Sequence, residues 1–364
     1  MQCGNGAHRC GVEWGQLVDT FDVSMVSTWV FAFNPVPIAL GKAATWQIGR
    51  WWLVRWQYAI GPRRLRPMRG HPAPAMSSTI TFDAVTKSYP AGRGAESGSP
   101  AVDSFTARIE AGTTTVLLGS SGCGKTTLLR MVNRMVEPSS GRVLIDDEDV
   151  ATRDAVALRR SIGYVMQNAG LLPHRRVIDN ITLVPRLQGA DRHDARCRAL
   201  ELMDMLDLDR DLAGRYPHQL SGGQAQRVGV ARALAADPEV LLMDEPFGAV
   251  DPLVRRDLQR EMARIQAELG KTIIFVTHDV DEALALGDEI ILLREGAQVA
   301  QRGSGPQLLA DPADDFVARF LGLDDAARQL QLTDVAESRI VLDRAGRAVG
   351  RLADEASSEA EERA

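Results

Sequence analysis

The chain has 364 residues, of which 45% are hydrophobic and 25% are charged, so it can bury a globular core. Its length allows one large domain or two ordinary ones. A formal net charge of −6 argues against the broad positive charge that is typical of nucleic-acid-binding proteins.

The first 76 residues differ in composition from the rest of the chain. They contain all six tryptophans, and eight basic against three acidic residues. No run of about 18 uncharged apolar residues lies among them, so no membrane-spanning helix is predicted. We expect an unstructured extension, or one that is absent from the native protein, with the true start at Met76. An interfacial segment rich in Trp and Arg is the alternative.

Regular structure is expected after Met76. Alternating apolar residues predict strands over residues 79–89 and 102–109, and an apolar run predicts a buried strand over residues 115–118. A glycine-rich loop follows over residues 119–127, and apolar residues recur at helical spacing after it.

From there, short apolar strands alternate with helices. The predicted strands are 143–145, 162–165, 240–243, 272–276 and a hairpin of 289–294 with 297–300. The predicted helical segments are 177–212, 222–236, 252–269 and 279–286. This alternation predicts an α/β fold with a mostly parallel sheet that helices cover on both faces.

The loop has the residue types that bind phosphate. Residues 119–126 match the pattern G-x-x-x-x-G-K-[ST] at every fixed position. Glycines let backbone N–H groups surround a phosphate, and the following helix adds its positive N-terminal end. We expect Lys125 to reach the β- and γ-phosphates of ATP and the Thr126 hydroxyl to ligate Mg²⁺. The predicted nucleotide-binding residues here are Gly119, Ser120, Ser121, Gly122, Cys123, Gly124, Lys125, Thr126 and Thr127.

Two acids follow the predicted strand 240–243. Asp244 emerges at its carboxyl end, where open α/β sheets present ligands, and is expected to hold Mg²⁺ through oxygen. Glu245 is placed to polarise a water molecule against the γ-phosphate. An isolated Asp-Glu pair is more typical of a solvated turn, but together with the phosphate loop it indicates an ATPase site.

The residues that precede and begin helix 222–236 identify the family. Leu220-Ser221-Gly222-Gly223-Gln224 matches the signature of ABC transporter ATPases, and residues 80–321 resemble that family in the order of their motifs. The resemblance implies an ATP-binding domain over residues 77–321. It implies a P-loop NTPase ABC cassette with a mostly parallel sheet, an antiparallel β part and a helical subdomain at about residues 168–220.

The resemblance also implies individual roles. Tyr89 matches the aromatic residue that stacks on adenine. Gln167 matches the glutamine that joins the Mg²⁺ and catalytic site to the transmembrane partner, and His278 matches the histidine that contacts the γ-phosphate. Ser221 and Gly223 match residues that close over the γ-phosphate of the opposite subunit. Gly222 and Gln224 of the same signature are also expected to bind nucleotide. The loop at residues 248–251 is expected to contact the other subunit, with Val250 in place of the usual leucine.

The same resemblance implies the partners. Two ATP-binding subunits would form a two-fold dimer on the cytoplasmic face of the membrane, bound to transmembrane permease subunits and indirectly to a solute-binding protein. No nucleic acid is expected as a partner. A soluble ABC ATPase acting on ribosomes or DNA is less favoured, because the chain has one cassette and no heptad run. An inactive nucleotide sensor is also less favoured, because Lys125, Asp244, Glu245 and His278 are all present.

Further stretches resemble the group of this family that takes up osmoprotectants. They are residues 128–134, 137–141, 162–174, 216–220, 244–249 and 314–317. The loop within 162–174 carries most weight, because it must match the permease rather than ATP. Part of an apolar surface just after Gln167 is expected to stay exposed until the permease docks; its residues are Leu171, Leu172, Pro173 and Val177. The resemblance implies import of quaternary-ammonium solutes such as glycine betaine, proline betaine, choline or carnitine. Import of amino acids such as methionine is the alternative.

The C-terminal tail, residues 322–364, is expected to be short and weakly structured. Residues 339–342 and 348–352 could pair as a hairpin, and an acidic, disordered end follows. Related uptake ATPases often carry a tandem of cystathionine-β-synthase-type domains after the cassette. This tail is too short for a complete regulatory domain of that kind.

Overall fold

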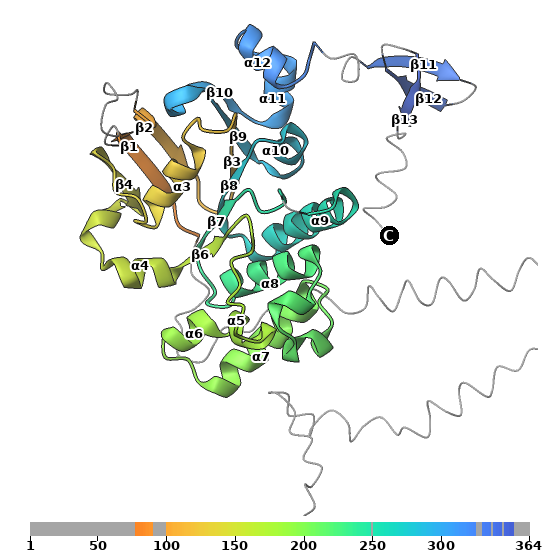
Figure 1. The fold of residues 1–364 in the computed structure, drawn as a ribbon. Helices are drawn as coiled ribbons and strands as arrows, with labels where there is room; N and C mark the ends of the chain where they lie inside the picture. Colours follow the sequence, from red (N-terminus) through yellow and green to blue (C-terminus); the bar gives the residue numbers. More distant parts are fainter. Residues whose placement is uncertain are drawn as a thin grey trace, which may run out of the picture. The chain divides into compact units, whose positions relative to one another are not determined.

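The computed structural model describes residues 77–89, 100–248, 250–324, 330–335, 338–343 and 346–352. Figure 1 shows this fold. The predictions about the N-terminal extension, Ala249 and the acidic end concern residues outside the described ranges.

A six-stranded sheet forms the centre of the cassette, in the order β10-β9-β3-β8-β7-β6. Its neighbouring strands are all parallel except β9 and β10, which form the predicted hairpin. The strands are β3 (Thr114–Gly119), β6 (Ile162–Val165), β7 (Val240–Asp244), β8 (Thr272–Thr277), β9 (Glu289–Leu293) and β10 (Val299–Gly303). The predicted mostly parallel sheet is confirmed.

A second, antiparallel sheet has the order β2-β1-β4-β5. Its strands are β1 (Ile80–Lys87), β2 (Val102–Ile109), β4 (Ser140–Ile145) and β5 (Glu148–Asp149). Phe82 and Phe105 pack edge to face with ring centroids 5.3 Å apart. The buried core continues from these strands through helix α3 (Lys125–Val132) to the parallel sheet. The start of α3 therefore lies at the edge of the parallel sheet where β3 ends.

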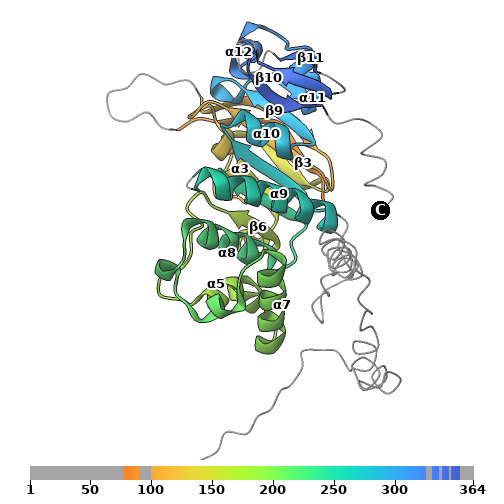
Figure 2. The same cartoon turned by 90° about the vertical axis from the view of Figure 1, so that its right-hand side faces the viewer.

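The parallel sheet has helices on both faces. In β8, Ile274 and Val276 belong to the core that includes α3. Ile273 and Phe275 alternate with them and face a pocket that α9 (Pro252–Leu269) and α10 (Val280–Leu286) also line. Figure 2 shows α9 and α10 running along that face.

The helical subdomain lies beside β6 (Figures 1 and 2). It contains α5 (Val177–Ile181), α6 (Leu183–Leu187), α7 (Arg192–Met205) and short 3₁₀ helices at Arg210–Gly214 and Pro217–Gln219. Helix α8 (Gly222–Leu234) packs against α5, α7 and β6 and joins the subdomain to the sheet. No helix in the described ranges is both long and apolar enough to span a membrane.

Several elements differ from the sequence prediction. Residues 125–127, expected in a loop, form the first turn of α3. The helical segment 177–212 is broken into several helices, because Pro185 and the turn at Gly189 interrupt it and Asp191 caps a new helix through its carboxylate. The prediction lacked α4 (Ala155–Ser161), α11 (Gly305–Ala310), α12 (Asp315–Phe320) and 3₁₀ helices at Val150–Thr152 and Glu295–Ala297.

The tail contains a third sheet of three antiparallel strands, β11-β12-β13. The strands are β11 (Gln331–Val335), β12 (Ser338–Leu342) and β13 (Ala348–Arg351). The expected hairpin is present as β12 and β13, and β11 pairs with β12 in addition. Sequence reasoning missed β11 because its alternation is short and Asp334 interrupts it.

Candidate functional site

The predicted phosphate loop connects β3 directly to α3. Gly124 forms the N-cap of α3 with φ of 109°, in the left-handed region. A Cβ at this position would lie 2.5 Å from the carbonyl oxygen of Ala101, so only glycine fits without a shift of the backbone. Ser120, Ser121 and Gly122 are exposed at the tip of the loop. The loop therefore presents backbone and hydroxyl groups to solvent at a helix N-terminus, where anions bind.

Lys125 lies folded against this loop. Its Nζ donates to the carbonyl oxygens of Gly119 and Ser120, both at 2.7 Å, and the residue is only 4% exposed. Cys123, also buried, places its Sγ 3.8 Å from the same ammonium. The geometry holds a positive charge inside the loop, where a bound phosphate would meet it.

Asp244 ends the buried strand β7 and faces the start of α3. Thr126 Oγ1 donates to its Oδ1 at 2.8 Å. Hydroxyl and carboxylate oxygens are the ligands that Mg²⁺ prefers, and a protein typically supplies only a few of them beside substrate phosphates and water. The residues present therefore fit Mg²⁺ carried by a nucleotide, and Thr126 and Asp244 are the residues that would hold it.

The side chain of Glu245 contacts two more predicted site residues, which come from distant parts of the chain. Its backbone N–H donates to the carbonyl of Val276 at 3.0 Å, and its φ of 44° turns it away from the strand. Gln167 Nε2 donates to its Oε2 at 3.2 Å, and His278 Nδ1 lies 3.3 Å from its Oε1. The three residues predicted to be catalytic thus form one cluster beside Asp244.

The turn that carries His278 is fixed by a buried acid. Thr277 Oγ1 donates to Glu282 Oε2 at 2.6 Å and accepts the backbone N–H of Asp279 at 3.0 Å. Burial raises the pKa of the Glu282 carboxyl, while Arg255 from α9 lies within 3.8 Å and opposes that shift. Sequence reasoning did not single out Glu282. An acidic residue in the first turn of a helix is common, so its position in α10 did not indicate a functional role.

Two other residues contact the carboxylate of Asp244, and sequence reasoning did not assign either of them to the site. Tyr164 from β6 donates its hydroxyl to Asp244 Oδ2 at 3.2 Å, and Arg130 Nη2 lies 3.5 Å from that oxygen. Both lie in stretches that resemble the osmoprotectant group, but the resemblance gave neither residue a role at the site. The parallel pairing of β6 with β7 brings Tyr164 to the site.

The signature residues lie apart from this cluster, at the start of α8. Ser221 caps the helix by accepting the N–H of Gln224, and the Gln224 side chain accepts the N–H of Ser221 in return. Ser221 and Gly222 are exposed, and Gly223 is half-buried. None of the hydrogen bonds found among the described residues joins them to the phosphate loop. They form a second, separate helix N-terminus open to solvent.

Tyr89 lies two residues beyond β1 and is 55% exposed. Lys87 Nζ sits 5.3 Å from the centre of its ring. An aromatic ring that is more than half exposed can stack on a flat heteroaromatic group.

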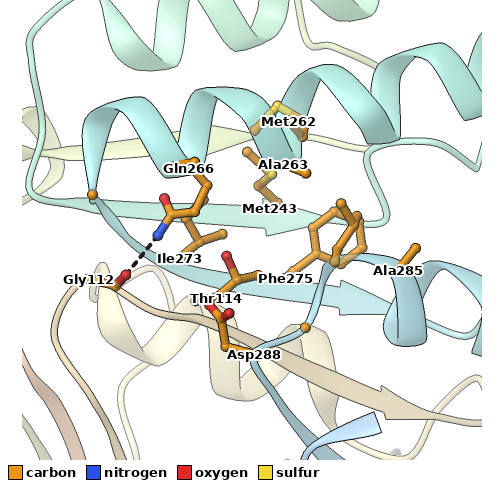
Figure 3. Close-up of a pocket in the computed structure, with 14 residues that line it drawn as sticks. Gly112, Thr114, Met243, Met262, Ala263, Gln266, Ile273, Phe275, Ala285 and Asp288 are labelled. Atoms are coloured by element: carbon orange, nitrogen blue, oxygen red, sulfur yellow. Dashed lines mark hydrogen bonds between the residues drawn. The ribbon is translucent and has the colours of Figure 1, made fainter. Parts of the chain in front are cut away.

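A pocket with apolar walls lies apart from these residues. Figure 3 shows it between α9, α10 and the sheet, with Met243, Phe275 and Met262 on its apolar walls. Its volume is about 410 Å³, and Gln266 Nε2 donates to the carbonyl of Gly112 at its rim at 2.9 Å. None of the predicted site residues is among its described lining residues. The converging side chains at Asp244 and Glu245, rather than this hollow, identify the candidate site.

Comparison with known proteins gives matches over the described cassette. The ABC transporter family model matches residues 102–248. The chain is 47% identical over 245 residues to a carnitine transport ATP-binding protein of Listeria monocytogenes, covering 67% of this chain and 60% of the relative. It is 50% identical over 238 residues to a glycine betaine uptake ATP-binding protein of Escherichia coli K12, covering 65% of this chain and 77% of the relative.

A solved structure with a similar fold is that of an ATP-binding cassette, a dimer in a post-hydrolysis state bound to ADP and Pi. It is 33% identical, with a TM-score of 0.57, and the match covers 62% of this chain and 98% of that one. The chain spans about 60% of the length of the carnitine-transport relatives that it matches.

Proposed function

This chain belongs to the ABC transporter family of ATP-binding proteins, and on that premise we propose that it hydrolyses ATP to energise an importer of quaternary-ammonium osmoprotectants. The observation that carries the enzymatic part is the cluster of Lys125, Thr126, Gln167, Asp244, Glu245 and His278 around one sheet edge.

Each residue of the cluster has a task in ATP hydrolysis. The Lys125 ammonium and the loop N–H groups bind the β- and γ-phosphates. Thr126 and Asp244, with Gln167, would hold Mg²⁺, which would offset the negative charge of the phosphate oxygens. Glu245 orients a water molecule for in-line attack and accepts its proton; its side chain is 22% exposed and lies at the same sheet edge. His278 steadies Glu245 and contacts the γ-phosphate.

A second copy of the chain supports the reaction from the other side. The exposed helix N-terminus at Ser221, Gly222 and Gly223 suits an anion, yet none of its described bonds reaches the phosphate loop of its own chain. A two-fold dimer would place it against the ATP of the partner. The related cassette bound to ADP and Pi was solved as a dimer, which supports this arrangement.

The proposed permease contact lies on both sides of Gln167 in the sequence. Met166 is 42% exposed, Pro173 is exposed, and Leu171 and Leu172 are half-buried. Val177 was expected to share this surface, but it is fully buried at the start of α5. The remaining apolar surface suits a transmembrane partner.

The proposed solutes are glycine betaine, proline betaine, choline and carnitine. The similarity to curated proteins of carnitine transport and glycine betaine uptake supports this class. Deleting the gene for this chain is expected to abolish uptake of at least one of these four radiolabelled solutes in high salt. Normal uptake of all four, with loss of methionine uptake instead, would move the assignment to the amino-acid alternative. Unchanged transport of every solute would favour a soluble ABC ATPase.

Removal of the C-terminal sheet is expected to change little. A variant that ends at Leu323 lacks β11, β12 and β13 but keeps every residue of the proposed site. Its rate of ATP hydrolysis, and the response of that rate to salt, should stay within about twofold of wild type, since surface changes remote from a site act weakly. Loss of a response to ionic strength in the shortened chain would show that this sheet is regulatory.

A further inference from the structure

The carboxylate of Asp244 is held on both of its oxygens. Thr126 Oγ1 donates to Oδ1 at 2.8 Å, and the Tyr164 hydroxyl donates to Oδ2 at 3.2 Å. Arg130 Nη2 lies 3.5 Å from Oδ2 as well. With a separate donor on each oxygen, the plane of the carboxylate is fixed, and its side chain is only 11% exposed.

Packing and strand pairing hold Tyr164 in position for its contact with Asp244. Its ring packs partly against the main hydrophobic core, and β6 pairs in register with β7, with Tyr164 opposite Leu242.

We propose that Tyr164 and Arg130 are positioning residues that fix Asp244 for the Mg²⁺ bound with ATP. The proposal rests on the function proposed above. Mg²⁺ demands near-ideal octahedral geometry, so the orientation of each ligand determines its affinity. Without the Tyr164 hydroxyl, Oδ2 keeps only Arg130, whose side chain is 44% exposed and can draw the carboxylate toward solvent. Neither residue touches ATP or water in the reaction as proposed.

The test separates metal binding from nucleotide binding. ATP binding is measured by calorimetry, in EDTA and at rising Mg²⁺ concentration, in a Glu245→Gln background that does not turn ATP over. Tyr164→Phe is expected to raise the Mg²⁺ concentration that half-saturates the ATP complex about tenfold, as is typical when a partner of a metal ligand is lost. ATP affinity in EDTA should not change. A merely structural effect would weaken ATP binding in both conditions.

Tyr216→Phe is the matched control. It removes the same hydroxyl from a tyrosine that lies against His218 and Arg176, away from Asp244. Its Mg²⁺ titration should match the parent. Arg130→Gln provides a second variant at an exposed position, and it should shift the Mg²⁺ requirement in the same direction. In the double variant of Tyr164→Phe and Arg130→Gln, the increase in the half-saturating Mg²⁺ concentration should be smaller than the product of the two single increases, because both residues act on one oxygen.

The outcomes distinguish this inference from the proposed function. A Mg²⁺ titration of Tyr164→Phe that matches the parent overturns the inference. If Tyr164→Phe does not fold, an unshifted titration of Arg130→Gln overturns it instead. The proposed function fails separately if the wild-type chain neither binds nor hydrolyses ATP in Mg²⁺.

Discussion

The Glu245→Gln variant is expected to bind ATP but to hydrolyse it at least about 100-fold more slowly than wild type. The amide has the shape of the carboxylate but cannot accept a proton from water. Gln167 and His278 contact the carboxylate without replacing it as a base. Phosphate release measures the rate. Light scattering in ATP should show a stable dimer, because two copies that cannot hydrolyse remain closed.

Glu110→Gln is the control for this change. Glu110 is exposed beyond the end of β2 and pairs only with exposed Arg108 among the described residues. Its hydrolysis rate should equal that of wild type, since exposed ion pairs contribute little. A purified Glu245→Gln protein that released phosphate at the wild-type rate would refute the role assigned to Glu245.

The Lys125→Ala variant is expected to bind ATP about 10- to 100-fold more weakly than wild type. The change removes the buried cation of the loop and leaves the carbonyls of Gly119 and Ser120 without their donor. The loss should appear in ATP binding itself, unlike the loss in Glu245→Gln.

Thermal unfolding with and without ATP gives the measurement for Lys125→Ala. Wild-type protein should gain stability with rising ATP concentration, because ATP binds the folded state. The variant should need a correspondingly higher concentration for the same gain. An identical ATP response in both proteins would remove Lys125 from the proposed site.

Sequence reasoning predicted the parts of the site that local pattern determines. The phosphate loop was found because glycines, lysine and threonine recur at fixed spacing between an apolar strand and a helix. Asp244 and Glu245 were found because they follow a run of buried residues. His278 was found through the family resemblance, at the end of a predicted strand. The sheet order that brings these strand ends together was not predicted. It arises from pairing between strands far apart in the chain.

The parts that were missed depend on tertiary contacts. Tyr164 reads as one more apolar strand residue, and only the pairing of β6 with β7 turns its hydroxyl toward Asp244. Val177 reads as surface in a docking loop, but it is buried at the start of α5. In contrast, α11 could have been found: Ser304 and Gln307 form a capping box around Pro306, a local signal that was overlooked.

One measurement joins the chemistry of the site to transport. A strain that lacks this chain is supplied with either the wild-type gene or the Glu245→Gln gene, and uptake of radiolabelled glycine betaine, proline betaine, choline and carnitine is followed in high salt. The wild-type gene should restore the lost uptake, and the Glu245→Gln gene should leave it at the level of the deletion strain while the protein accumulates normally. Full restoration of uptake by Glu245→Gln would contradict the claim that hydrolysis at this site energises the importer.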